Sequence, residues 1–213
     1  MGAQFFSISE AMRFGWRTAK KHFWFFLRLI AVVLVVTYGP ALIAQSFDRT
    51  ELPTLAVLLF FLAGILFWVL QLLVSVGLIQ IVLTHVSGGR GHINDLFSGG
   101  RHVVNYFLGS LAYGLAVAAG FVLLVIPGII LMVRLQFYQY LIVDARMGPI
   151  EALKASWDIT RGSFWNLALF WLAVIGVNIL GLAALGIGLL WSAPTAVLAS
   201  GVVYRRLSQR PHA

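Results

Sequence analysis

The sequence has no cysteine, and only 10% of its 213 residues are charged, seven of them acidic. The missing cysteines exclude disulfides, thiolate metal sites, iron–sulfur clusters and cysteine nucleophiles. Hydrophobic residues make up 61% of the chain, whereas a soluble domain has about 45–50% apolar and about 25% charged residues. Because too few polar side chains remain to cover a surface in water, the composition predicts a membrane protein.

The apolar residues gather in six runs. The runs are Phe23–Ala44, Leu55–Val82, Val103–Ile126, Ile129–Val143, Phe164–Ala184 and Ile187–Tyr204. About 20 helical residues cross a hydrocarbon core, so four of these runs are long enough alone and the last is near the lower limit. The fourth run has to extend to about Gly148 to cross the core. The six runs predict an all-α integral membrane protein with six transmembrane helices as three hairpins, in one polytopic domain over residues 1–213.

Three turns are expected between the members of these hairpins. A continuous helix from Val103 to Val143 would reach about 60 Å, twice the thickness of the core, so a break is placed at Pro127-Gly128. The same reasoning places turns near Gly186 and Gly188 and within Gln45–Pro53.

The basic residues predict the orientation. With the N-terminus in the cytoplasm, twelve of the fifteen lysines and arginines lie on that side. This asymmetry follows the positive-inside rule and predicts a cytoplasmic (inner) membrane protein with both termini cytoplasmic, residues 206–213 forming a short basic tail. It also accounts for the net charge of +8 without nucleic acid, since no basic run with interleaved aromatics lies outside the apolar segments.

A segment of 15 residues recurs at an offset of 141: Glu10–Trp24 resembles Glu151–Trp165 in its charge spacing and aromatic residues. Each copy predicts an amphipathic helix at the cytoplasmic interface, where it contacts anionic lipid headgroups. The residues assigned to these contacts are Arg13, Trp16, Arg17, Lys20, Lys154, Trp157 and Arg161. We interpret the pattern as repeat-like units over about 7–52, 88–147 and 148–205; the alternative is coincidence produced by aromatic belts.

An ordered set of motifs in the second half resembles the YciC-like group of bacterial integral membrane proteins. The motifs are Ile126–Leu131, Arg134, Leu141–Asp144, Glu151–Trp157, Thr160–Trp165, Gly186–Gly188, Pro194 and Tyr204-Arg205. The resemblance implies a relation to the membrane domain attached to some glycerophosphodiester phosphodiesterases. Their phosphodiesterase activity belongs to a separate soluble domain, whose metal-binding signature has no counterpart here.

The candidate site residues lie within the apolar runs. Arg134 falls about 8 Å into a predicted span, near Gln136 and Tyr138, and a buried arginine is costly unless it meets carbonyls, water or a phosphate. It is therefore either a structural anchor or a ligand for a lipid headgroup. Arg28 lies near the cytoplasmic boundary, where its side chain reaches the interface.

No nucleophile–base pair, cofactor motif or metal cluster is visible in the sequence. We therefore expect a non-enzymatic membrane protein with no cofactor and with a structural, lipid-interacting or accessory-subunit role. A carrier of a lipid or small amphiphile is the alternative, and a membrane-embedded enzyme is third. A homo-oligomer or a larger membrane complex is a further expectation.

Overall fold

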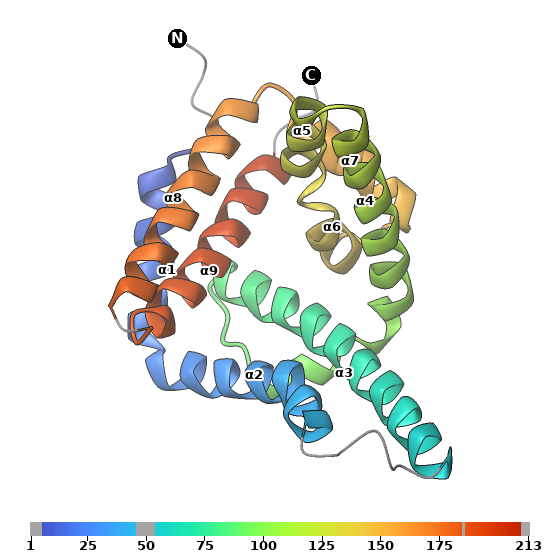
Figure 1. Cartoon of the computed structure of the whole chain (residues 1–213). Helices are drawn as coiled ribbons and strands as arrows, with labels where there is room; N and C mark the ends of the chain where they lie inside the picture. Colours follow the sequence, from blue (N-terminus) through green and yellow to red (C-terminus); the bar gives the residue numbers. More distant parts are fainter. Residues whose placement is uncertain (1–5, 46–53, 185, 210–213) are drawn as a thin grey trace.

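The computed structural model describes residues 6–45, 54–184 and 186–209. Over these residues the chain is helical and contains no β-strand (Figure 1). The α-helices are α1 Ile8–Lys21, α2 Phe23–Gln45, α3 Thr54–Val86, α4 Val103–Leu123, α5 Val125–Leu135, α6 Tyr138–Asp144, α7 Pro149–Ile159, α8 Phe164–Ala183 and α9 Leu189–Ser208. Two short 3-10 helices, η1 Ile93–Phe97 and η2 Gly100–His102, precede α4.

Five helical segments of the described residues are long and apolar enough to cross a membrane. They are Phe23–Ile43, Leu55–Val86, Ile93–Leu123, Val125–Asp144 and Phe164–Ala183. Large apolar side chains on these segments are exposed at the protein surface, which is what lipid-facing helices require. The fold therefore defines a multi-pass helical membrane protein.

The break between the third and fourth predicted spans is displaced from Pro127-Gly128. Leu124 is the extended residue that separates α4 from α5, and Pro127 lies in the first turn of α5. Proline lacks the N–H that would bind the carbonyl of Leu123, so α4 ends there, while the first turn of the next helix tolerates proline. Gly128 allows α4 and α5 to pack closely and does not form the turn. A Cβ added to Gly120 of α4 would lie 2.9 Å from the Cα of Gly128.

The predicted fourth span, Ile129–Val143, is not one continuous helix. It is divided into α5 and α6 by Gln136 and Phe137, which we call the α5–α6 break. Together α5 and α6 cover Val125–Asp144, so this span begins earlier than predicted and ends without needing Gly148.

The predicted sixth span corresponds to α9, which is not among the five apolar segments. Ten of its residues are buried, and it carries Ser192, Thr195 and Ser200 in place of a continuous apolar surface. The ring of Trp191 stacks on that of Phe23 at 4.9 Å, although the predicted topology placed them on opposite sides of the membrane. The arrangement of six spans as hairpins is therefore not confirmed, because α9 forms part of the protein interior.

The other predicted boundaries have separate outcomes. The turn near Gly186 and Gly188 is confirmed, and Gly186 adopts a φ of 77° that favours glycine. Of the turn predicted within Gln45–Pro53, only Gln45 belongs to the described residues. Helix α9 continues to Ser208 and so includes the first residues of the basic tail predicted over 206–213, whose residues from 210 on lie outside the described part of the chain.

Both amphipathic segments form helices, α1 and α7. The buried positions of α1 are Ala11, Gly15 and Ala19, and the residues 141 positions later, Ala152, Ser156 and Thr160, are also buried. The buried stripe of α1 thus consists of small residues. Trp16 is 48% exposed and lies beside the basic residues.

The segment ahead of each helix pair contacts the second helix of another pair. Helix α1 lies along α9, η1 lies on α3, and α7 lies on α4, α5 and α6. The close contacts are Gly15 against the carbonyl of Thr195, Gly77 against the main chain of Leu96, and the Ser156 hydroxyl with the carbonyl of Arg134. These contacts connect the pairs α2–α3, α4–α5 and α8–α9 in a closed ring (Figure 1). Whether the three units are repeats stays a prediction.

Candidate functional site

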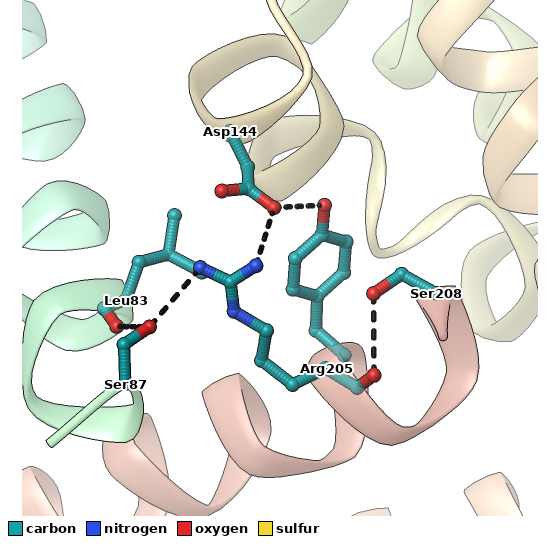
Figure 2. Close-up of polar contacts among 6 residues, drawn as sticks. Leu83, Ser87, Asp144, Arg205 and Ser208 are labelled. Carbon is teal, nitrogen blue, oxygen red and sulfur yellow. Dashed lines mark hydrogen bonds and ion pairs between the residues drawn. The ribbon is translucent and has the colours of Figure 1, made fainter.

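Three helices end around the guanidinium of Arg205. Its Nη1 donates to the carboxylate of Asp144, the last residue of α6, at 3.1 Å. Its Nη2 donates to the hydroxyl of Ser87, directly after α3, at 3.2 Å, and Arg205 itself lies in the last turn of α9. Figure 2 shows both contacts, and we call Ser87, Asp144, Tyr204 and Arg205 the helix-end cluster. Helix C-termini carry partial negative charge, so a cation is favoured where three of them meet.

Tyr204 completes the helix-end cluster from the inner side. Its hydroxyl donates to the same carboxylate oxygen of Asp144 at 2.9 Å, and its ring stacks on that of Tyr140 at 5.1 Å. Tyr204 is fully buried, whereas the side chains of Arg205 and Asp144 are 30% and 25% exposed. The cluster thus has an apolar floor and a charged, accessible edge.

A cavity of about 630 Å³ opens between α1, the end of α3 and the end of α9. We call it the arginine pocket. Its lining residues are Glu10, Arg13, Phe14, Arg17, Val86, Ser87, Val202, Arg205, Arg206 and Gln209. Four arginines and one glutamate therefore face one cavity, and that glutamate already pairs with Arg206 at 3.2 Å.

Arg134, the leading residue of the sequence prediction, lies at the α5–α6 break. Its carbonyl accepts a hydrogen bond from the hydroxyl of Ser156 at 2.9 Å and lies 3.2 Å from that of Thr160. The Ser156 hydroxyl also accepts the N–H of Phe137 at 3.1 Å. Helix α7 thereby binds the main-chain groups that the break leaves without helical partners, which an interrupted membrane helix requires.

The guanidinium of Arg134 lies over the ring of Trp157, with its carbon 3.7 Å from the ring centroid. Its Nη2 is 3.4 Å from the carbonyl of the same tryptophan. Its Nε is buried and, among the described residues, has no hydrogen-bond partner. The cation therefore contacts an aromatic face, an interaction worth about 0.5–2 kcal/mol.

The other candidate residues of the spans do not form one site with Arg134. Gln136 donates to the carbonyl of Val133 at 2.7 Å and accepts from the indole of Trp171 at 2.6 Å. Tyr138 is buried and donates to the hydroxyl of Ser110 at 3.0 Å. Arg28 is exposed on α2. Gln136 thus contributes to the α5–α6 break, while Tyr138 faces α4.

The predicted interfacial residues divide into two groups. Arg13, Trp16, Arg17 and Lys20 are all exposed on α1, and two of them line the arginine pocket. On the later copy, Lys154 and Arg161 are exposed, whereas Trp157 is half-buried under Arg134. The two tryptophans at equivalent sequence positions therefore have different environments.

Ser156, Thr160 and the partnership of Asp144 with Arg205 were missed by the sequence prediction. Ser156 and Thr160 are spaced by four residues, the spacing that places two hydroxyls on one helical face. That spacing was the available signal. Nothing local in the sequence connects Asp144 to Arg205, which is 61 positions away. Within the described residues no group of three or more His, Cys, Asp or Glu side chains is placed to hold a metal ion.

Comparison with known proteins assigns the chain to a family. Residues 24–211 match the family described as "Protein of unknown function (DUF975)", and the chain belongs to it. It is 28% identical over 165 residues to the uncharacterized protein Mb2590 of Mycobacterium bovis and to the uncharacterized protein Rv2560 of Mycobacterium tuberculosis. The match covers 78% of this chain and 50% of each relative, so the chain spans about half the length of the curated relatives it matches. No solved structure gives a significant match.

Proposed function

We propose that this chain is a non-enzymatic protein of the cytoplasmic membrane that contacts anionic lipids and has a structural or accessory role there. The carrying observation is the division of α1 into two faces. Ala11, Gly15 and Ala19 are buried within the protein, while the face with Arg13, Trp16, Arg17 and Lys20 is exposed. A helix with an exposed basic and aromatic face is typical of attachment to an anionic membrane surface.

The surface outside α1 supports the same proposal. Trp24 and Trp165, at the starts of α2 and α8, are 70% and 77% exposed. Exposed tryptophans next to apolar helices are typical of the boundary between hydrocarbon and headgroups. Since basic residues gather on α1 and at the end of α9, we place both chain termini on the cytoplasmic side. We also retain, as part of the proposal, the kinship with the YciC-like group and its phosphodiesterase-linked membrane domains.

The environment of Arg134 favours the structural role over the carrier alternative. A carrier would need a headgroup to reach the guanidinium, but the ring and carbonyl of Trp157 already contact it. The main-chain groups at the α5–α6 break are likewise bound by Ser156 and Gln136. Broken helices that coordinate substrates leave such groups available to the ligand instead.

The proposal is tested by measuring lipid selectivity in reconstituted membranes. We expect spin-labelled phosphatidylglycerol to associate with the protein more strongly than spin-labelled phosphatidylcholine. The variant K20Q/K154Q/R161Q removes three exposed charges outside the arginine pocket and should reduce that preference, whereas the charge-conserving K20R/K154R/R161K should keep it. If both variants retained the full preference, or if the unmodified protein had none, the proposed lipid role would be wrong.

A further inference from the structure

We propose that the arginine pocket binds the phosphate group of one anionic ligand, held between α1 and α9. The inference rests on the proposed lipid-contacting function and makes it specific, because it names one cavity and one chemical group. The basic residues of the arginine pocket are Arg13 and Arg17 from α1 and Arg205 and Arg206 from α9, and they surround a cavity of about 630 Å³. Cavities of about 300–1,000 Å³ are typical of small-molecule sites.

The charges of the pocket do not cancel among themselves. Arg205 is paired with Asp144 and Arg206 with Glu10. In the part of the chain that the structure describes, Arg13 and Arg17 have no carboxylate within ion-pair distance. They are four residues apart on one helix, a spacing at which like charges repel each other. An anion in the pocket would remove this repulsion.

The position of these two arginines is also not explained by the helix dipole. Favourable cation sites lie in the last turn of a helix, which in α1 holds Lys20 and Lys21. Arg13 and Arg17 lie in earlier turns and face the cavity that the end of α9 closes. Single exposed charges contribute little, but several of one sign around a concave surface concentrate the potential there.

The donor chemistry favours phosphate over other anions. Guanidinium groups present planar pairs of N–H donors that match two oxygens of a phosphate, and four of them from two elements surround a tetrahedral group better than a planar carboxylate. Phe14, Val86 and Val202 line the same cavity. This apolar part suits the glycerol and first methylenes of a phospholipid, although a free phosphate shares the recognised chemistry.

The test uses the full chain, purified in detergent, and native mass spectrometry to count bound phosphatidylglycerol during a titration. The variant R13Q/R17Q should weaken binding of the tightest-bound lipid by about tenfold or more, since it removes two charge-assisted contacts. The matched control K154Q/R161Q removes equal charge from α7 and the turn after it, outside the pocket, and should change that affinity by less than about threefold. R13K/R17K keeps the positive charge but lacks the paired N–H donors of the guanidinium group. Its affinity for the lipid should therefore lie between those of the other two variants.

Competition identifies the source of the phosphate. Phosphatidylcholine, which has a phosphate but no net charge, should bind more weakly, and displacement of the lipid by inorganic phosphate would show that a soluble ligand uses the pocket as well. Equal losses in R13Q/R17Q and K154Q/R161Q would overturn the pocket but leave the general lipid role standing. Unchanged binding in R13Q/R17Q, with thermal unfolding like that of the unmodified protein, would overturn it too. If K20Q/K154Q/R161Q lost its lipid preference while R13Q/R17Q kept its binding, the result would support the proposed lipid-contacting function but not the pocket.

Discussion

Arg205 donates a hydrogen bond to the carboxylate of Asp144 over 3.1 Å and thereby joins the ends of α6 and α9, although the two residues are 61 positions apart. The same guanidinium reaches Ser87 at the end of α3. One side chain therefore connects the ends of α3, α6 and α9. Figure 2 shows the guanidinium between Asp144 and Ser87. Arg205 also lines the arginine pocket.

Asp144→Asn should destabilise the protein by about 1–2 kcal/mol, because it weakens a charge-assisted contact that is only partly exposed to solvent. The matched control is Glu10→Gln, which breaks the ion pair with Arg206. That pair has nearly the same length, 3.2 Å, but more than half of each side chain is exposed, so the change should stay within about 0.5 kcal/mol. Thermal unfolding in detergent measures both; equal effects would remove the structural role of the cluster.

Gly15→Ala should destabilise the packing of α1 on α9. An added Cβ would meet the main-chain carbonyl of Thr195, and the backbone cannot yield as a flexible side chain can. We expect a loss of about 1–3 kcal/mol. The control is Gly114→Ala on α4, where nothing lies within 4 Å and alanine improves the helical propensity. A Gly15→Ala protein as stable as the control would contradict the contact between α1 and α9.

Ser156→Ala should cost about 1–3 kcal/mol, because it leaves the N–H of Phe137 and the carbonyl of Arg134 with fewer partners at the α5–α6 break. Ser200→Ala is the control, since that hydroxyl donates to the carbonyl of Ala196 in its own helix and bridges no break. Hydrogen exchange should localise the effect to residues around 133–140. Uniform exchange across α4 and α5 would argue against a local role.

Arg134→Gln and Trp157→Leu should each lower the free energy of unfolding, and their effects should be coupled by about 1 kcal/mol, since they form one cation–π pair. Arg28→Gln, at an exposed position, should change stability by less than about 0.5 kcal/mol. A double-mutant cycle from thermal unfolding measures the coupling. If Arg134→Gln left stability intact and abolished binding of phosphatidylglycerol, Arg134 would be a ligand for the headgroup rather than an anchor.

Acidification should destabilise the contact of His22 with His85, whose rings lie 5.7 Å apart. Burial is the largest cause that lowers the pKa of His22, followed by the charges of His85, Lys21 and Arg90. The unfolded state therefore binds the proton more readily, so this contribution to stability is present above about pH 6.5 and is lost as the pH falls. His22→Gln should flatten the dependence of the thermal midpoint on pH below that value. The exposed His92→Gln should not change it.

The sequence predicted most helices well because length and hydrophobicity are local properties. The starts of α2 and α8, Phe23 and Phe164, coincide with the predicted runs, and the amphipathic helices α1 and α7 follow from their charge spacing. The break before α5 was misplaced by three residues, because proline ends a helix ahead of itself. The α5–α6 break was not predicted, since the hydroxyls that bind its main chain come from α7, about 20 residues later.

The charged residues were harder to assign than the helices. The sequence singled out Arg134 because a cation in an apolar run is conspicuous, and the structure pairs it with Trp157. Arg13 and Arg17 were assigned to an interface, yet in the structure they also line a cavity with Arg205 and Arg206. A cavity is formed by the approach of separate helices, so no window of sequence contains it.

By itself the sequence determined that this chain is a helical membrane protein with amphipathic helices, because those properties depend on composition and on periodicity within a single segment. The tertiary structure decided that α9 is an interior helix, that α1 packs on it through Gly15, and that Arg205 joins three helix ends. Each of these depends on which distant surfaces fit together, and shape complementarity between segments far apart in the chain is not encoded in the hydrophobicity of either segment alone.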